Sequence, residues 1–199
     1  MYQIKEFTVS YRIEILNAAS KLFAERGFKD TSIADLSKLS GAAEGTIFHH
    51  FKNKEGILIE LLIKVKKDIL REVSENIEKQ GTGMELVEHA VHLFFTLSET
   101  MEFEFLLLFR NYPYQLASVN PDCRKCIEEI YNSFLELFIE GIEKGQGDGT
   151  IRECKPFRTA VILFAMVVGI IRFKLFNLYP VESFYVEIMD SCRKMLEPR

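Results

Sequence analysis

Two pairs of potentially reactive side chains stand out in the sequence, the first of them a cysteine pair. Cys123 and Cys126 form a CxxC motif, and the intervening Arg124 and Lys125 could lower a thiolate pKa and favour redox chemistry. A zinc site would need a second CxxC or a nearby histidine pair, and a thioredoxin-like motif would need a preceding strand. The sequence offers neither, so we expect its four cysteines to be free, partly buried thiols.

The second pair is His89 and His92, three residues apart on a predicted helix with Glu85 and Glu88 nearby, a spacing that a metal ion could accept. Two histidines on a solvated helix face are commoner, so we expect no metal and no other cofactor. The glycine-rich stretch 145–149 mimics a phosphate loop but lacks the preceding strand and the full spacing, which indicates a flexible connection. No nucleophile–base pair is apparent, which argues against an enzyme.

The composition is that of a soluble globular protein with an uneven charge. The 199 residues are 48% hydrophobic and 27% charged, and 17 of them are Phe. Residues 1–67 carry 11 basic and 8 acidic side chains, a net +3, whereas the remainder carries 14 and 21, a net −7. This pattern argues against general nucleic-acid coating but permits a local DNA contact. The longest apolar run, Thr159–Ile171, is too short to span a membrane, so we expect a buried helix and a cytosolic protein.

Apolar residues recur at three- and four-residue spacing along the chain, which predicts an all-α fold of about nine helices. Ser32 and Asp35 have capping-box spacing, and Asn53 can cap the fourth helix. The predicted helices span residues 10–26, 32–39, 43–50, 53–80, 84–100, 102–116, 122–144, 156–178 and 181–197. Gly and Pro mark the breaks, among them Gly27, Gly41, Gly81–Gly83, Tyr112-Pro113, Asn120-Pro121, Gly145–Gly149, Pro156 and Tyr179-Pro180.

The short helices Thr31–Leu39 and Ala43–His50 are separated by a tight turn at Gly41, an arrangement typical of a helix-turn-helix. In such a motif the first helix supports the second, which enters the major groove of DNA. Ile47 and Phe51 are four residues apart and should anchor the second helix in the core. The helix face opposite Ile47 and Phe51 comprises Ala42, Gly45, Thr46 and His49, and Lys52 and Lys54 follow the helix.

The stretch Ile15–Leu58 resembles the DNA-binding domain of the TetR family almost throughout. The matching residues are Ala19, Leu22-Phe23, Gly27-Phe28, Thr31-Ser32-Ile33, Gly41, Gly45-Thr46-Ile47, His50-Phe51 and Lys54. The resemblance implies that Thr46, Phe48, His50 and Lys54 contact phosphates, and that residues 42–46 and 49 meet bases. The DNA-binding set that we expect is Thr31, Ala42, Ala43, Glu44, Gly45, Thr46, Phe48, His49, His50, Lys52 and Lys54.

Two residues depart from the family pattern within this stretch. The family usually has Tyr where Phe48 stands, so one hydroxyl-to-phosphate hydrogen bond is missing. It usually has Ser at Ala43, where the hydroxyl caps the recognition helix, and the loss of such a cap costs about 1 kcal/mol. We expect the fold to persist and operator binding to be weaker or differently tuned.

The rest of the chain resembles the family only in architecture, which implies ligand binding and dimerisation. We place a DNA-binding domain at residues 1–54 and this second domain at 55–199, linked by the helix 53–80. By this likeness the last two helices pair with their copies in a four-helix bundle, with Val161, Val168 and Ile171 at the interface. An apolar cavity within the aromatic-rich body should contact the ligand through Phe105, Phe109, Arg110 and Phe164.

The sequence therefore predicts a ligand-responsive regulator, a repressor that leaves a palindromic operator when a small lipophilic ligand binds. Its partners would be double-stranded operator DNA, a second copy and the effector. Arg110 would favour an acyl-like anion, whereas Glu102 or Glu104, if it faced inward, would favour a lipophilic cation. Two alternatives are an enzyme that uses the Phe-rich cavity, and a redox or metal sensor that uses Cys123 and Cys126 or His89 and His92. Activation in place of repression is a further alternative.

Overall fold

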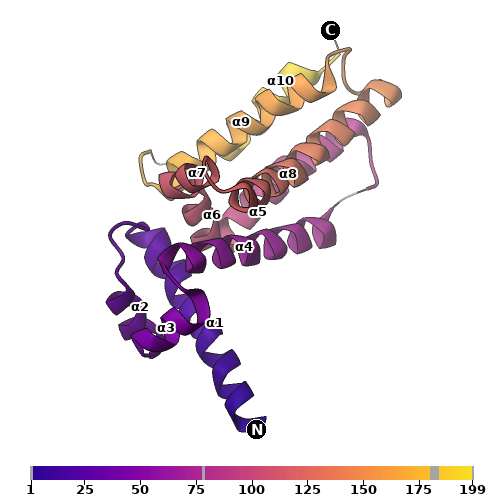
Figure 1. Cartoon of the computed structure of the whole chain (residues 1–199). Coiled ribbons are helices and arrows are strands. Elements are labelled where there is room, and N and C mark those ends of the chain that lie inside the picture. The colour runs from indigo at the N-terminus through magenta and orange to yellow at the C-terminus, as the bar shows by residue number, and fades with distance from the viewer. Residues whose placement is uncertain (1, 78, 180–183, 199) are drawn as a thin grey trace. The chain divides into compact units, whose positions relative to one another are not determined.

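The computed structural model describes residues 2–77, 79–179 and 184–198, with side chains from residue 11 onward, and every regular element in these ranges is an α-helix (Figure 1). Within these ranges the all-helical prediction is confirmed, with ten helices in place of about nine. The predicted break at Pro180 and the predicted start at residue 181 lie outside the described residues. The helices are α1 (Tyr2–Glu25), α2 (Ile33–Ser40), α3 (Glu44–Phe51), α4 (Lys54–Asn76), α5 (Gly83–Thr100), α6 (Glu102–Phe109), α7 (Asn111–Ala117), α8 (Pro121–Asp148), α9 (Pro156–Leu175) and α10 (Phe184–Leu196).

The additional helix arises because the predicted helix 102–116 is broken at Arg110. Arg110 has an extended backbone, with φ −69° and ψ 153°, and serves as the N-cap of α7. In a continuous helix the ring of Pro113 would clash with the carbonyl of Phe109. The break places Pro113 in the first turn of α7, where its missing N–H has no consequence.

The glycine-rich stretch 145–149 is helical as far as Asp148, so the break that the sequence predicts there comes only at Gly149. A Cβ atom at Gly83 would lie 1.9 Å from the backbone nitrogen of Gly145, and one at Gly145 would lie 2.5 Å from the side chain of Ile151. The start of α5 therefore contacts the end of α8 backbone to backbone. Gly83 and Gly145 are needed for this close approach, whereas Gly149, with the left-handed φ of 80°, follows the last residue of α8.

The chain divides into two compact units that do not follow the order of the sequence. The first unit comprises residues 1–67 and 103–127, and thus combines the N-terminal helices with most of α6, with α7 and with the start of α8. The second unit comprises residues 68–102 and 128–199.

Each unit has its own apolar core. In the first unit, α1 packs against α2 and α3, and the core residues include Ile15, Ala19, Leu22, Phe23, Leu36, Ile47 and Phe51. In the second unit, α5, α9 and α10 pack against one another. Its core is rich in aromatic rings, among them Phe94, Phe134, Phe138 and Phe164.

Candidate nucleic-acid interface

The helix-turn-helix begins at a complete capping box. The Asp35 amide donates to Ser32 Oγ at 3.0 Å, and the Ser32 amide donates to Asp35 Oδ2 at 2.9 Å. The Ser32 hydroxyl also donates to Asp35 Oδ2 at 2.5 Å, and this hydrogen bond, followed by the one from the Ser32 amide, lowers the pKa of Asp35. At its other end α2 stops at Gly41, which has the left-handed φ of 71° and donates its N–H to Ser37. Both features were predicted from the sequence, and both are present.

The recognition helix α3 is held by two buried side chains and presents small and polar ones. Ile47 and Phe51 are 1% and 3% exposed and anchor α3 in the core of the first unit. Gly45 and His49 are exposed on another part of the helix, and a Cβ at Gly45 would meet nothing within 4 Å. A base edge can therefore approach the backbone of α3 closely at Gly45.

The remaining predicted DNA contacts fall into three groups. Ala43, Glu44, Phe48 and Lys52 are exposed, and Thr46 and His50 are half-buried. Ala42 is only 2% exposed, because the turn after Gly41 directs its methyl group into the core. The prediction that Ala42 lies on the solvent-exposed face is therefore wrong. Thr31 is 1% exposed, and its hydroxyl donates to the carbonyls of Gly27 at 2.9 Å and Leu22 at 3.3 Å. The side chain of Thr31 therefore supports the loop and is not presented to DNA.

Lys54 also differs from the expectation of a phosphate contact. Its ammonium donates to the carbonyls of Phe28 at 2.7 Å and Thr31 at 2.8 Å, and it lies 4.4 Å from the centre of the Phe28 ring. Burial lowers the pKa of Lys54, and the Asp30 carboxylate opposes that change. In this structure Lys54 binds the loop between α1 and α2.

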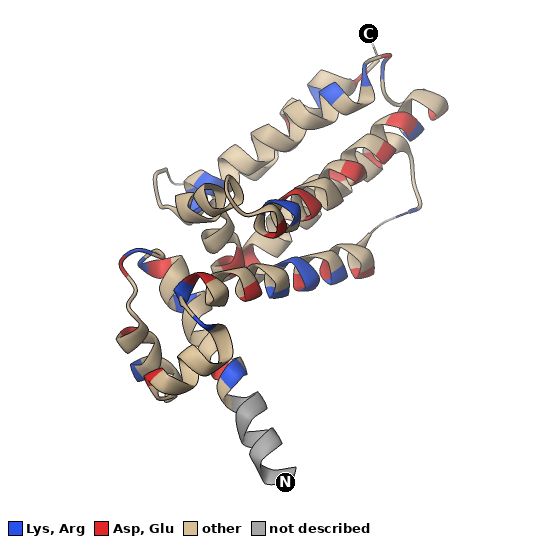
Figure 2. Ribbon diagram, in the orientation of Figure 1, with Lys and Arg blue, Asp and Glu red and all other residues tan. Residues whose placement is uncertain are grey.

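The charge on α3 limits how it can read DNA. The helix carries Glu44 and two histidines but no Lys or Arg (Figure 2). Its N-cap, Ala43, forms no side-chain hydrogen bond, as its residue type predicts. Base readout would then depend on His49, Thr46 and Glu44 together with close apolar contact, without the bidentate Arg–guanine pair that is commonest in such interfaces.

The four predicted ligand-contacting residues are divided between the two units. Phe105 and Phe109 are buried in α6, with ring centres 6.1 Å apart, and belong to the first unit. Phe164 belongs to the second unit, where its ring lies 5.3 Å from that of Phe94 and 5.8 Å from that of Tyr131. Arg110 donates to backbone carbonyls of the first unit, so the predicted role in holding an anionic ligand is replaced by a structural one.

The predicted dimer residues occupy different faces of α9. Val161 is 41% exposed, Val168 is half-buried and Ile171 is fully buried in the core. Ile171 is therefore unavailable to a partner. The exposed apolar surface of α9 includes Phe157 and Ile162, at 61% and 52%.

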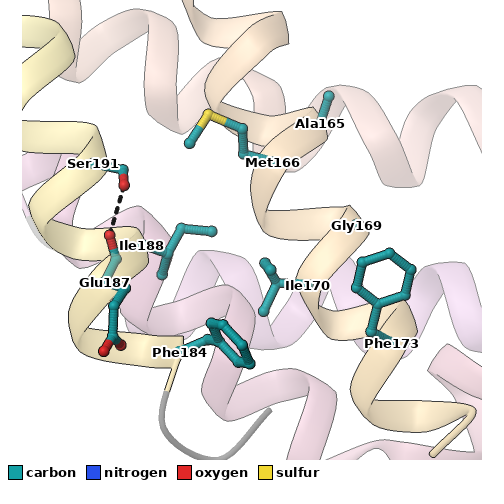
Figure 3. A pocket seen from close by; sticks show the side chains of 9 residues that line it. All are labelled: Ala165, Met166, Gly169, Ile170, Phe173, Phe184, Glu187, Ile188 and Ser191. Carbon is teal, nitrogen blue, oxygen red and sulfur yellow. Dashed lines mark hydrogen bonds between the residues drawn. The ribbon is translucent and has the colours of Figure 1, made fainter. Parts of the chain in front are cut away.

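A groove of about 310 Å³ lies between α9 and α10 (Figure 3). Ser191 donates a hydrogen bond to the Glu187 carbonyl at the edge of the groove. The groove is lined by Ala165, Met166, Gly169, Ile170, Phe173, Phe184, Glu187, Ile188 and Ser191.

The apolar helix α9 is largely unburied in the single chain. Only 28% of its 18-residue apolar window is buried, so the prediction of a buried helix is wrong for the single chain. By length and composition alone α9 could cross a membrane, although helices of soluble proteins also meet that criterion.

Cys123 is buried in the core, and His89 and His92 each have a hydrogen-bond partner. Cys123 is fully buried, and burial raises its pKa to about 11, the opposite of the lowering that its basic neighbours could cause. His89 Nε2 lies 2.8 Å from the Asn76 carbonyl, and His92 Nδ1 lies 3.1 Å from the Tyr185 hydroxyl. Across the described side chains, no group of three or more His, Cys, Asp or Glu is placed to hold a metal ion.

Residues 15–61 match the family model described as bacterial regulatory proteins, tetR family. The chain is 27% identical over 148 residues to the fatty acid metabolism regulator protein of Bacillus subtilis, an alignment that covers 74% of each chain. A putative transcriptional regulator from Saccharomonospora viridis, solved in complex with choline, has the same fold with a TM-score of 0.79. It is 24% identical, and the match covers 94% of this chain and 98% of that one.

A second solved structure is the transcriptional regulator FadR from Bacillus subtilis in complex with stearoyl-CoA. Its TM-score is 0.71 at 22% identity, with 92% of this chain and 98% of that chain covered. The two structural likenesses establish the fold, while the family model covers the helices that form the DNA-reading motif. Residues 15–61 thus carry the domain of the tetR family of bacterial regulatory proteins, and the chain as a whole is similar to transcriptional regulators that contain it.

Proposed function

We propose that the protein is a homodimeric repressor that binds a two-fold operator and leaves it when a small lipophilic effector binds. The observation that carries the proposal is the geometry of α3, whose Ile47 and Phe51 are buried while Gly45 and His49 are exposed. Two copies would place their recognition helices about 34–36 Å apart, in successive turns of the major groove. Residues 1–54 would read DNA and residues 55–199 would bind the effector and the partner copy, in the cytoplasm.

The exposed apolar surface of α9 and α10 supports the homodimer. Phe157, Ile162 and Val186 are 61%, 52% and 64% exposed, which is costly for a protein that remains a monomer in water. A second copy that packs α9 and α10 against the first would remove this surface from water. Such an isologous pairing would give the protein the two-fold symmetry of a palindromic site.

Light scattering tests the dimer. We expect twice the chain mass of 23.1 kDa, and we expect Ile162→Glu to give monomers because a charge would be buried without a partner. Ile63→Glu is the matched control, since Ile63 is 44% exposed on α4, outside the α9–α10 face, and its variant should remain a dimer. A monomeric parent at micromolar concentration, or a dimeric Ile162→Glu variant, would overturn the proposal.

The aromatic core of the second unit is the site that we propose for the effector. Besides Phe94 and Tyr131, the rings of Phe134 and Phe138 lie about 6 Å from that of Phe164, at 6.1 and 6.0 Å. Rings packed at these distances leave little room, so an effector would have to separate them, and the binding energy would then favour a changed conformation. The likeness to a fatty acid metabolism regulator and to a structure with stearoyl-CoA supports a long-chain acyl effector.

The effector is tested by titrating stearoyl-CoA and choline separately into the preformed protein–operator complex. We expect stearoyl-CoA to release DNA at concentrations where choline does not, and Phe164→Ala to raise the concentration needed. Release by choline alone would identify a cationic effector held by aromatic rings, and would overturn the acyl proposal. Release by neither ligand would also overturn the acyl proposal, while the DNA-binding role is tested separately.

A further inference from the structure

The last carbonyls of α1 are bound by a residue from far along the chain. Arg26 and Gly27 donate their amides to the carbonyls of Leu22 and Phe23, which leaves those of Ala24 and Glu25 without a partner in the helix. The Arg110 guanidinium, 86 residues beyond Ala24, donates to the Ala24 carbonyl through Nε at 2.9 Å and Nη2 at 2.6 Å. It also donates to the Glu25 carbonyl at 2.7 Å. A cation at this position is favoured by the negative end of the helix dipole.

Tyr112 contacts the same corner through its ring and its hydroxyl. The ring stacks on that of Phe28, with centres 3.9 Å apart and planes 12° apart. The hydroxyl donates to Glu55 Oε1 at 2.9 Å, in the first turn of α4. Burial, and then the hydrogen bond to Glu55, raise the pKa of Tyr112. One side chain thus joins the loop after α1 to the start of α4.

The loop that these residues hold leads directly into the DNA-reading motif. Only residues 26–32 separate the end of α1 from α2, and Ser32 is already the N-cap of α2. The direction in which α2 leaves this loop sets the placement of α3, because the two helices pack against each other. Arg110 and Tyr112 are in the same compact unit as these helices.

We infer that Arg110 and Tyr112, on the α6–α7 connection, are positioning residues for operator binding. They act on α3 through the α1–α2 loop and the start of α4, and they contact no DNA themselves. A change at either residue should therefore weaken specific DNA binding while the protein remains folded. This inference concerns the DNA-reading unit and does not depend on the identity of the effector.

The test compares Arg110→Gln with Arg110→Lys and with Lys144→Gln, an exposed lysine on α8 whose loss is the matched change of charge. The operator is a sequence selected with the parent protein, and affinities are corrected for the active fraction by stoichiometric titration. We expect Arg110→Gln to lower operator affinity about tenfold, as for the loss of a charged hydrogen-bond donor. Affinity for non-specific DNA and the salt dependence of binding should not change. Arg110→Lys should recover part of the affinity, and Lys144→Gln should match the parent.

Tyr112→Phe provides a second measurement that preserves the ring stacking. It removes only the hydrogen bond to Glu55, so we expect a smaller loss, about threefold to fivefold. Tyr179→Phe is its control, because Tyr179 is 61% exposed and its ring contacts Phe173. Hydrogen exchange at the Gly27 and Thr31 amides should accelerate in the Arg110→Gln variant.

Three results would overturn the inference. The first is operator affinity within twofold of the parent for both Arg110→Gln and Tyr112→Phe. The second is a log–log salt slope lowered by about one unit in Arg110→Gln, because that would make Arg110 a phosphate contact. The third is unchanged exchange at Gly27 and Thr31, which would show that the loop does not depend on Arg110.

Discussion

Replacement of Lys54 by Met distinguishes the two roles that sequence and structure assign to this side chain. Met keeps most of the aliphatic stem and removes the ammonium group. In the structure that ammonium donates hydrogen bonds to the carbonyls of Phe28 and Thr31, at 2.7 and 2.8 Å, and lies over the face of the Phe28 ring. Both hydrogen bonds are part-buried, so water can replace the lost donor only in part.

The size of the effect follows from these contacts. A hydrogen bond to a charged group contributes about 1.5–3 kcal/mol, and an exposed cation–π contact about 0.5–1 kcal/mol. Lys54 is partly exposed, which reduces both contributions, so we expect a loss of about 2 kcal/mol in the free energy of unfolding. For a chain of this size that loss lowers Tm by about 4–8 °C.

The assay combines denaturant unfolding with operator binding at several salt concentrations. Lys54→Met should lose stability and leave the log–log salt slope unchanged. Lys52→Met is the matched control: Lys52 is exposed at the end of α3, so its loss should lower the slope by about one unit with little change in stability. If Lys54→Met lowered the slope by about one unit and kept the parent's stability, Lys54 would be a phosphate contact and the structural assignment would be refuted.

Three further predictions concern the cap of α3, the cap of α2 and the cysteines. Ala43→Ser should stabilise the protein by about 1 kcal/mol in thermal unfolding, because Ala43 is an N-cap with no side-chain hydrogen bond and a hydroxyl would supply one; an unchanged Tm would show that the hydroxyl does not reach the helix. Asp35 has a lowered pKa, so its contribution to stability is present above its unfolded pKa and is lost as pH falls through the folded value. The stability difference between the parent and Asp35→Asn, followed by denaturant titration, should therefore shrink in acid, and a constant difference would contradict this. Cys123 and Cys192 are fully buried with pKa values raised to about 11, so a thiol reagent at pH 8 should modify half-buried Cys154 first. Equal rates at the three thiols would show that the core opens readily.

The parts of the fold that depend on neighbours in sequence were predictable. The capping box at Ser32, the turn at Gly41 and the spacing of Ile47 and Phe51 all act within a few residues, and the structure contains each of them. The absence of a side-chain cap at Ala43 follows from its residue type alone.

The features that depend on distant residues were not predictable. Nothing in the spacing of the sequence indicates that Arg110 binds the end of α1 or that Lys54 binds the loop before α2, because these pairs meet only in the folded chain. Periodicity also fails for α9, a helix apolar on nearly every side, where Ile171 is buried and Ile162 is exposed. At Gly145 a sequence signal for a break was outweighed by the close approach of two helices.

Selection of bound sequences from a random pool of double-stranded DNA tests the regulatory role most directly. A homodimer that presents α3 to the major groove should enrich an inverted repeat, with half-site centres one helical turn apart, about 10 base pairs, or a multiple of it. A Gly45→Glu variant, which places a bulky negative charge on the exposed face of α3, should enrich no sequence from the same pool. Failure of the parent to enrich any sequence, or an enriched motif without two-fold symmetry, would contradict the assignment of this chain as a homodimeric operator-binding regulator.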